Sequence, residues 1–349
     1  MLQEAVVFYI LSKKQIKYKI LIIKKQNSGG NMYNILVLIP MDEEKKKLLE
    51  EKSKGCKIVY SNENEVTKEE VQNANIVIGS PKVDMVKGSP NLKWMQLNTA
   101  GADQYIKEGI LSEEVILTNS TGAYGLAVSE HMLAMLLELL KKLHIYRDNQ
   151  NKRLWKSEGR VRSIRGSKVL IVGLGDIGCN FGEMIKALGG YTIGVKRRES
   201  AKPSYIDELY LNDKLDELLP QADIVALCLP STKDTQKLFD AQRIGKMKTG
   251  SILLNMGRGT SVDTDALCDA VESGHLYGAG LDVVDPEPLP SDHRIWGLEN
   301  VVITPHISGW YNLAETYERI FGISLDNLER FLKDEELFNV IDFNTGYVK

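Results

Sequence analysis

Three glycines, Gly173, Gly175 and Gly178, have the spacing G-x-G-x-x-G and follow the apolar segment Lys168–Val172. In such a loop the first glycine permits a tight turn, the second lets the backbone approach a pyrophosphate, and the third lets a helix pack closely on the strand. A helix-compatible stretch follows, and its N-terminal N–H groups would face the phosphates. The sequence therefore predicts a dinucleotide site formed by Gly173, Gly175, Asp176, Ile177 and Gly178.

Three consecutive cations, Lys196, Arg197 and Arg198, follow the next apolar segment, Tyr191–Val195. A site for NAD usually places an acidic residue there, where it binds the ribose 2′-hydroxyl. Cations instead suit the 2′-phosphate of NADP. We therefore expect NADP(H) to be preferred, with NAD(H) still possible, because the cations could face solvent and Glu199 could turn toward the ribose.

Three later apolar segments are each followed by polar residues that could do chemistry: Arg258, then Asp282 and Glu287, then His306. Open α/β sheets bind ligands at the carboxyl ends of their strands, so these side chains are expected at one edge. Taken singly, such an arginine, glutamate or histidine is more often a surface charge or a hydrogen-bonded polar group. We apply that interpretation to the other histidines, which are His131, His144, His275 and His293.

Taken together, the motifs resemble those of the D-2-hydroxyacid dehydrogenase family, and the resemblance runs from about Met32 to Tyr347. N-x-x-R-G contains Arg258, L-D-V-x-x-x-E-P contains Asp282 and Glu287, and T-P-H ends at His306. Further similar segments are Asn98–Asp103, Val128–His131, Leu219–Asp223 and Leu229–Thr232. Several motifs in the family's order are more specific than any one of them.

The resemblance implies a role for each of these residues. Arg258 would bind the substrate carboxylate and polarise the keto oxygen, for which a planar fork of donors is well suited. His306 would donate a proton to that oxygen as hydride arrives, and Glu287 would orient the imidazole and raise its pKa. The resemblance also places the amides of Ala100 and Gly101 at the substrate carboxylate, and Leu229, Pro230 and Asp282 at the cofactor, with Asp282 on the nicotinamide carboxamide.

The expected reaction is reduction of a small 2-keto acid such as glyoxylate, hydroxypyruvate or pyruvate, because NADP(H) pools usually favour reduction. One alternative is a dinucleotide-sensing, corepressor-like binding protein, since some relatives with that function keep the same triad. Another is phosphoglycerate dehydrogenase, which would need cations near a distal phosphate; Arg160, Arg162 and Arg165 are candidates. Trp310 could line the substrate pocket or serve only in packing.

Short apolar runs alternate with helix-like stretches, which predicts α/β structure with parallel sheets. The resemblance implies two doubly wound domains, a Rossmann nucleotide-binding domain and a flavodoxin-like substrate domain, with a cleft between them. We expect the substrate domain at 32–126 and 307–349 and the dinucleotide-binding domain at 127–306. Leu126–Tyr146 is expected to be one long, largely buried helix, and Glu315–Lys333 another.

Composition sets wider limits. The net charge of -3 gives no reason to expect nucleic acid or a membrane surface as a partner. The four cysteines lack metal-ligand spacing and suit a reducing, cytoplasmic compartment; no metal site is expected. A homodimer is expected by resemblance, with Leu126–Tyr146 contributing. Residues 1–31 carry six lysines against one acidic residue, and we expect a poorly ordered extension, translation assigned upstream of a true start at Met32, or an arm weakly attracted to lipid or anions.

Overall fold

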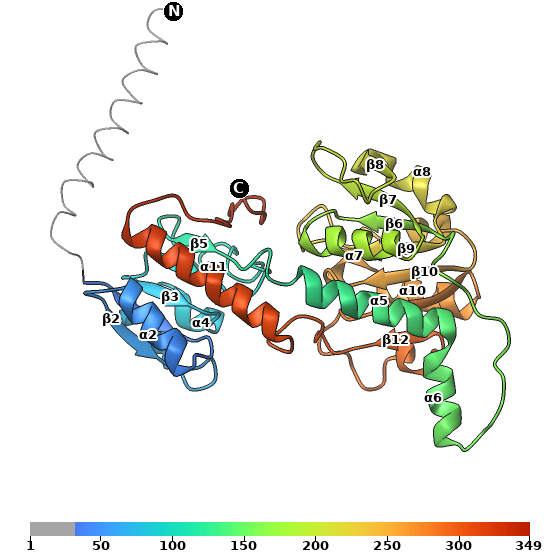
Figure 1. Ribbon diagram of the computed structural model, residues 1–349, viewed down its shortest axis with the longest axis horizontal. Coiled ribbons are helices and arrows are strands. Elements are labelled where there is room, and N and C mark those ends of the chain that lie inside the picture. The colour runs from blue at the N-terminus through green and yellow to red at the C-terminus, as the bar shows by residue number, and fades with distance from the viewer. Residues whose placement is uncertain (1–31) are drawn as a thin grey trace, which may run out of the picture.

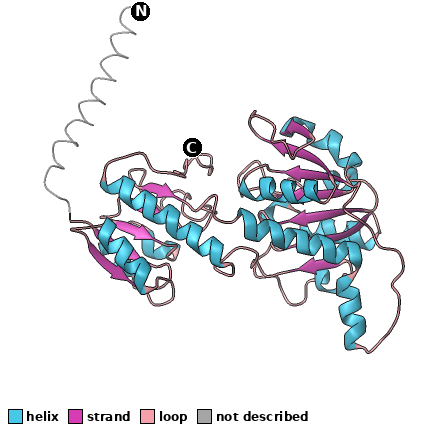
Figure 2. Cartoon of the chain, in the orientation of Figure 1, coloured by secondary structure: helices cyan, strands magenta, loops and turns pink. Residues whose placement is uncertain are grey.

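A computed structural model describes residues 32–349, so the expectations for residues 1–31 lie outside the described part of the chain. The chain forms two parallel sheets, each covered by helices, and the two units lie side by side (Figures 1 and 2). The predicted fold class, two parallel-sheet α/β domains, is confirmed. Between residues 32 and 349, none of the helices combines the length and apolar character that a bilayer crossing requires.

The first sheet has five strands in the order β2-β1-β3-β4-β5, which is the flavodoxin-like order. The strands are β1 (Asn34–Val37), β2 (Lys57–Tyr60), β3 (Ile76–Ile78), β4 (Trp94–Gln96) and β5 (Ile116–Thr118). Its helices are α2 (Glu43–Lys52), α3 (Lys68–Asn73), α4 (Val83–Val86) and, from the end of the chain, α11 (Ala314–Leu332). Phe321 and Leu328 of α11 pack on Ile35 and Trp94, so this helix covers one face of the sheet.

The second sheet has seven strands in the order β12-β11-β10-β9-β6-β7-β8. Counted from β6, this is the Rossmann order with one additional strand. The strands are β6 (Lys168–Val172), β7 (Tyr191–Lys196), β8 (Glu208–Leu211), β9 (Ile224–Leu227), β10 (Ser251–Asn255), β11 (Leu276–Leu281) and β12 (Val301–Ile303). Its helices are α5 (Gly125–Lys141), α6 (Leu143–Asn151), α7 (Asp176–Ala187), α8 (Leu215–Leu218), α9 (Ala241–Lys246) and α10 (Thr264–Glu272).

The prediction of a single helix over 126–146 is wrong, because the structure has two helices there, α5 and α6. Lys142 ends α5 in the left-handed conformation, with φ of 59°, and its N–H bonds to the carbonyls of Glu138 and Leu139. A left-handed residue at this position satisfies the last carbonyls of a helix. Contacts with the loop that follows hold α6 in its new direction: the amide of Glu158 donates to Tyr146 Oη at 3.0 Å, and the Glu158 side chain accepts from Asn149 at 2.7 Å.

Candidate active site

A cleft of about 690 Å³ lies at the carboxyl ends of strands β6, β7, β9 and β10 and is closed on its other side by loops of the first sheet. The predicted cofactor residues that line it are Gly173, Gly175, Asp176, Ile177, Lys196, Arg197, Arg198, Leu229 and Pro230. The predicted substrate residues Ala100, Gly101 and Arg258 line the same cleft. Gly178, Asp282, Glu287 and His306 are not among the residues that line it.

The glycine loop has the geometry that a pyrophosphate requires. Gly173 has φ of +101°, and a Cβ there would lie 2.7 Å from the carbonyl oxygen of Cys228. A Cβ on Gly178 would lie 2.0 Å from the Gly173 carbonyl oxygen, so only glycine permits this packing of α7 on the loop. Space is open at Gly175, where α7 begins. The loop therefore offers a close backbone approach and the N-terminus of a twelve-residue helix to an anion.

Asp176 reaches the cleft mainly through its position at the start of α7. One oxygen of its carboxylate accepts from the amide of Gly125 at 2.7 Å, and Gly125 is the first residue of α5. This contact joins the N-terminal ends of α5 and α7, which pack on each other. The carboxylate of Asp176 is thus bound within the protein, while its backbone remains in the cofactor loop.

The cations at the end of β7 all line the cleft, whereas Glu199 is not among the lining residues. Lys196 Nζ donates to Ser200 Oγ at 2.6 Å. The guanidinium carbon of Arg197 lies 3.7 Å from the ring centroid of Tyr347, a residue at the end of the chain. The end of this strand therefore presents positive charge to the place where the second ribose of a dinucleotide would lie.

Arg258 is held by a turn that follows β10. The side chain of the buried Asn255 accepts from the amide of Gly257 at 3.1 Å and donates to the carbonyl oxygen of Arg258 at 3.0 Å. Ser261 Oγ donates to the same carbonyl oxygen at 2.7 Å. These bonds fix the backbone of Arg258, so its side chain leaves the sheet in one direction.

The Arg258 side chain crosses the cleft to the loop of Ala100–Asp103. Its Nε donates to Asp103 Oδ2 at 3.0 Å, and its Nη1 donates to the Gly257 carbonyl at 2.9 Å. A Cβ on Gly101 would lie only 1.8 Å from Arg258 Nη2, so the guanidinium rests directly on this glycine. The structure thus brings together Arg258 and the two residues predicted to bind the substrate carboxylate.

Glu287 and His306 form the second half of the predicted triad. Nδ1 of His306 lies 3.1 Å from Glu287 Oε2, and the other carboxylate oxygen accepts from the amide of Val284 at 3.1 Å. The hydrogen bond to Glu287 raises the pKa of His306, although partial burial and the charge of Arg258 oppose the change. Burial alone would raise the pKa of Glu287, but hydrogen bonds from His306 and Val284 outweigh it and the pKa is lowered. This pair therefore favours an imidazolium next to a carboxylate.

Asp282 holds the loop that carries His306 through hydrogen bonds. Its carboxylate accepts from Thr304 Oγ1 at 2.6 Å and from the amides of Ile307 and Ser308 at 2.9 and 3.0 Å. Burial acts to raise the pKa of Asp282, but these bonds hold it below its usual value. The side chain is only 1% exposed, so its contact with a nicotinamide carboxamide stays a prediction.

The sequence interpretation missed several residues of the site. Asp103 was noted within a matching segment but received no role. His131, which we interpreted as a hydrogen-bonded polar residue, lies 2.9 Å from Thr304 Oγ1 through Nε2 and so extends the Asp282 network. Tyr347 gave no signal, because its contact with Arg197 joins residues far apart in the chain.

The remaining sequence candidates lie elsewhere. His275 and His293 are hydrogen-bonded, as expected, but the interpretation of His144 is wrong, since both of its ring nitrogens are buried without a partner among residues 32–349. Arg162 and Arg165 line a separate hollow with Lys248, near the amino ends of β9 and β10. Trp310 is 54% exposed and does not line the cleft.

Comparison with known proteins identifies the family of the chain. Residues 133–308 match the family model of the D-isomer specific 2-hydroxyacid dehydrogenase NAD binding domain. A putative 2-hydroxyacid dehydrogenase of Haemophilus influenzae is 30% identical, over 77% of this chain and 88% of the relative. A hydroxypyruvate reductase of Blautia hydrogenotrophica is 32% identical over 72% of this chain and 79% of the relative.

Among solved structures, a D-isomer specific 2-hydroxyacid dehydrogenase family protein of Aeromonas salmonicida superposes with a TM-score of 0.80. It is 30% identical and covers 90% of this chain and 100% of its own. The resemblance seen in the sequence motifs is thereby confirmed. The chain belongs to the D-isomer specific 2-hydroxyacid dehydrogenase family and is an NAD(P)-dependent oxidoreductase.

Proposed function

We propose that this protein is an NADP(H)-dependent reductase of small 2-keto acids, of the glyoxylate and hydroxypyruvate type, that forms D-2-hydroxy acids reversibly. The observation that carries the proposal is the position of Arg258, whose guanidinium rests on Gly101 in the same cleft that Lys196, Arg197 and Arg198 line. One cleft therefore combines a carboxylate-binding arginine with the elements that suit a phosphorylated dinucleotide. The proposed domain boundaries are 32–126 with 307–349 for the substrate domain and 127–306 for the cofactor domain.

The cofactor preference rests on charge. Lys196, Arg197 and Arg198 line the cleft beyond β7, and Glu199 does not. A 2′-phosphate in this place would meet three cations, whereas a ribose 2′-hydroxyl would find no carboxylate from these four positions to accept its hydrogen bond. The bound nicotinamide supplies the hydride to the substrate carbon.

The protein's own residues would bind the acid and move the proton. Arg258 would bind the substrate carboxylate together with the amides of Ala100 and Gly101, which orients the keto group. His306 would donate its proton to the keto oxygen, and the adjacent Glu287 would raise the pKa of the imidazole and so favour its protonated form. Asp282 would hold the His306 loop in place through Thr304, Ile307 and Ser308.

The proposal is tested by the absorbance of the cofactor at 340 nm. NADPH and NADH are compared with glyoxylate, hydroxypyruvate, pyruvate and 2-ketobutyrate, and the His306→Ala variant is the control. Faster oxidation of NADPH, lost in the control, supports the proposal. A preference for NADH would overturn the cofactor assignment alone, while binding without turnover of any acid would favour the sensor alternative. Arg162 and Arg165 lie outside the cleft, so a distal phosphate has no support from them.

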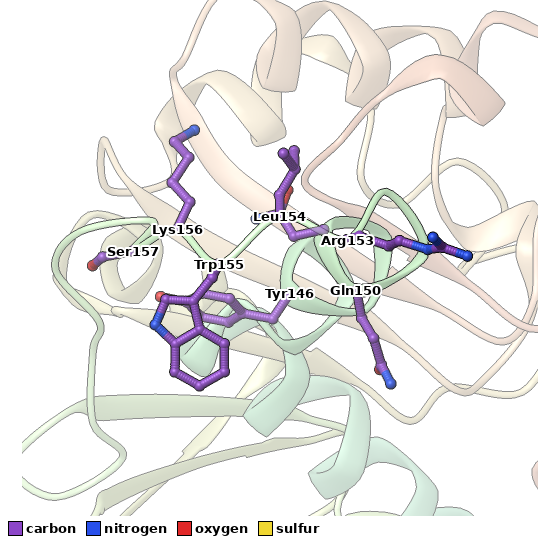
Figure 3. A pocket seen from close by; sticks show the side chains of 8 residues that line it. Tyr146, Gln150, Arg153, Leu154, Trp155, Lys156 and Ser157 are labelled. Carbon is purple, nitrogen blue, oxygen red and sulfur yellow. The ribbon is translucent and has the colours of Figure 1, made fainter.

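We also propose a homodimer in the cytosol. The helix expected to contribute to the interface is α5. Its apolar face packs on the seven-stranded sheet, so most of its apolar surface is already buried within the chain. The segment after α5 projects from the body (Figure 1). On this arm the side chains of Leu143, Leu154 and Val161 are exposed, and that of Trp155 is fully exposed. Trp155 and Tyr146 lie together at a hollow of about 670 Å³ on this arm (Figure 3). The four unpaired cysteines suit a reducing compartment.

Light scattering coupled to size-exclusion chromatography tests the dimer. A second copy seated on the arm would bury Trp155, so Trp155→Ala should shift the mass from dimer to monomer. A wild-type monomer would overturn the proposed dimer, whereas a dimer that the substitution leaves intact at low micromolar concentration would overturn the arm as its interface.

A further inference from the structure

The last residues of the chain form a hook on the substrate domain. After α11, the chain runs back toward the nucleotide-binding domain (Figure 1), and the amide of Ile341 donates to the Leu117 carbonyl at 2.8 Å. The amides of Asp342 and Gly346 then close a tight turn, bonding to Tyr347 and Asp342 carbonyls at 2.8 Å each. The Asp342 carboxylate accepts from the amides of Asn344 and Thr345 at 2.8 and 3.2 Å. The hook is therefore an ordered turn and presents Tyr347 in one position.

This hook reaches the cofactor cleft. Gly346, Tyr347 and Val348 line the same cleft as Lys196–Arg198 and the glycine loop. The Arg197 guanidinium stacks on the Tyr347 ring, with its central carbon 3.7 Å from the ring centroid. Arg197 is otherwise exposed, and no hydrogen bond or ion pair of its side chain with residues 32–349 is present. Tyr347 is therefore the contact that orients it.

Stacking and phosphate binding use different parts of a guanidinium. The ring contacts its flat face, while its five N–H groups lie in the plane and remain free to bind phosphate oxygens. An arginine held by one face loses less conformational freedom when it binds an anion. Tyr347 thus improves the geometry of Arg197 without competing for its donors.

We propose that Tyr347 is a positioning residue for the cofactor's 2′-phosphate, so that the C-terminal hook of the substrate domain completes a site on the nucleotide-binding domain. The inference rests on the proposed preference for NADP(H). It also assigns a specificity role to a part of the chain outside the Rossmann sheet. Cofactor choice would then depend on both domains and not on the β7 end alone.

The inference predicts a selective loss of affinity. Tyr347→Ala should weaken NADPH binding by about 3- to 10-fold, the range expected when one flexible side chain must be immobilised on binding. Binding of NADH should stay within about 2-fold, because NADH lacks the 2′-phosphate that Arg197 is proposed to bind. Tyr347→Phe keeps the aromatic face and should retain the wild-type affinity for both.

Phe338→Ala is a matched control. Arg330 stacks on Phe338 at 3.9 Å in the same C-terminal segment, but neither residue lines the cofactor cleft. This variant removes a comparable stacking contact without changing the surroundings of Arg197. It should leave the affinity for both cofactors unchanged.

The experiment is a titration of each full-length protein with NADPH and with NADH, followed by nicotinamide fluorescence. Arg197→Ala and the Arg197→Ala/Tyr347→Ala double variant complete a mutant cycle. A loss confined to NADPH, rescued by Phe and absent when Arg197 is already removed, supports the inference. Equal loss for both cofactors, or the same loss in the Arg197→Ala background, would overturn it while leaving the proposed function in place. A wild-type preference for NADH would overturn the cofactor assignment and this inference with it.

Discussion

The two halves of the proposed triad are built differently. Glu287 and His306 both follow strands of the seven-stranded sheet, and their 3.1 Å contact lies entirely within one domain. Arg258 also leaves that sheet, but its side chain ends on Gly101 and Asp103, which belong to the other sheet's loops. The proposed proton-transfer pair is thus formed within one domain, whereas the proposed carboxylate site requires both.

This difference separates two properties of the enzyme. The pKa of His306 is set mainly by Glu287, a neighbour on the same sheet edge. In the proposed mechanism, binding of the substrate carboxylate depends on how closely the Ala100–Asp103 loop approaches Arg258. A change on the substrate-domain side should therefore alter substrate binding, and it should affect the pKa of His306 only through the smaller influence of the Arg258 charge.

The largest effect is expected at His306. His306→Asn removes the proton donor, and kcat should fall by about 10²- to 10⁴-fold, the range typical of general acid catalysis. Binding of NADPH should remain within about 2-fold, because His306 does not line the cofactor cleft. Steady-state kinetics and fluorescence titration measure the two quantities. Retention of more than a tenth of the wild-type kcat would exclude His306 as the proton donor.

The next effect is expected at Gly101. A Cβ there would lie 1.8 Å from Arg258 Nη2, so Gly101→Ala must displace the guanidinium. Misplacement by about 1 Å can cost about 10²-fold, and we expect the loss to appear mainly as a higher KM for the keto acid. Gly245→Ala is the matched control, since its Cβ would meet open space. An unchanged KM in Gly101→Ala would show that the substrate binds elsewhere.

A smaller effect, with a distinct pH dependence, is expected for Glu287→Gln. Because Glu287 raises the pKa of His306, reduction should be fully active at low pH and decline as pH rises through that pKa. Without the carboxylate the pKa of His306 falls, so the decline should begin at lower pH. At a pH above both pKa values, activity should be about 10-fold lower for each pH unit by which the pKa has fallen. A pH profile of kcat/KM measures this, and a decline at the wild-type pH would show that Glu287 does not set the pKa.

The smallest effect is expected at Asp103. In its ion pair with Arg258 both side chains are partly exposed, Arg258 to 28% and Asp103 to 35%. Ion pairs of this kind contribute about 0–1 kcal/mol of interaction free energy. Asp103→Asn keeps a hydrogen-bond acceptor for Nε and should change the KM for the keto acid by less than about 5-fold. Saturation kinetics with glyoxylate check this. A loss as large as that of Gly101→Ala would mean that the carboxylate itself, and not only the loop, positions Arg258.

The sequence predicted those parts of the fold in which local pattern and burial agree. β6 has the bounds of the apolar segment Lys168–Val172 that the sequence indicated, because four of its five residues are buried. β8 was missed, since it is an edge strand of half-buried residues that begins with Glu208. The break at Lys142 had no signal either, because neither glycine nor proline marks it and the contacts that hold α6 come from Glu158.

Prediction of the site from sequence has the same limit, because only residues with a local sequence signal could be identified. The glycine loop and the three cations could be predicted because each lies in one short segment beside a strand end. Asp103 and Tyr347 could not, because their contacts with Arg258 and Arg197 cross between domains and depend on how the two domains meet. Local pattern predicts the residues at the end of a strand, but not the distant loop that will face them.

The most direct test of the difference between the two halves is the pH dependence of kcat/KM for glyoxylate reduction in wild type, Glu287→Gln and Gly101→Ala. We predict that Glu287→Gln shifts the decline in activity to lower pH, while Gly101→Ala lowers the whole profile and moves the decline much less and toward higher pH, because the displaced Arg258 charge lowers the pKa of His306 less than Glu287 raises it. A shift of the decline in Gly101→Ala equal to that in Glu287→Gln would contradict the separation of the proton-transfer pair from the carboxylate site.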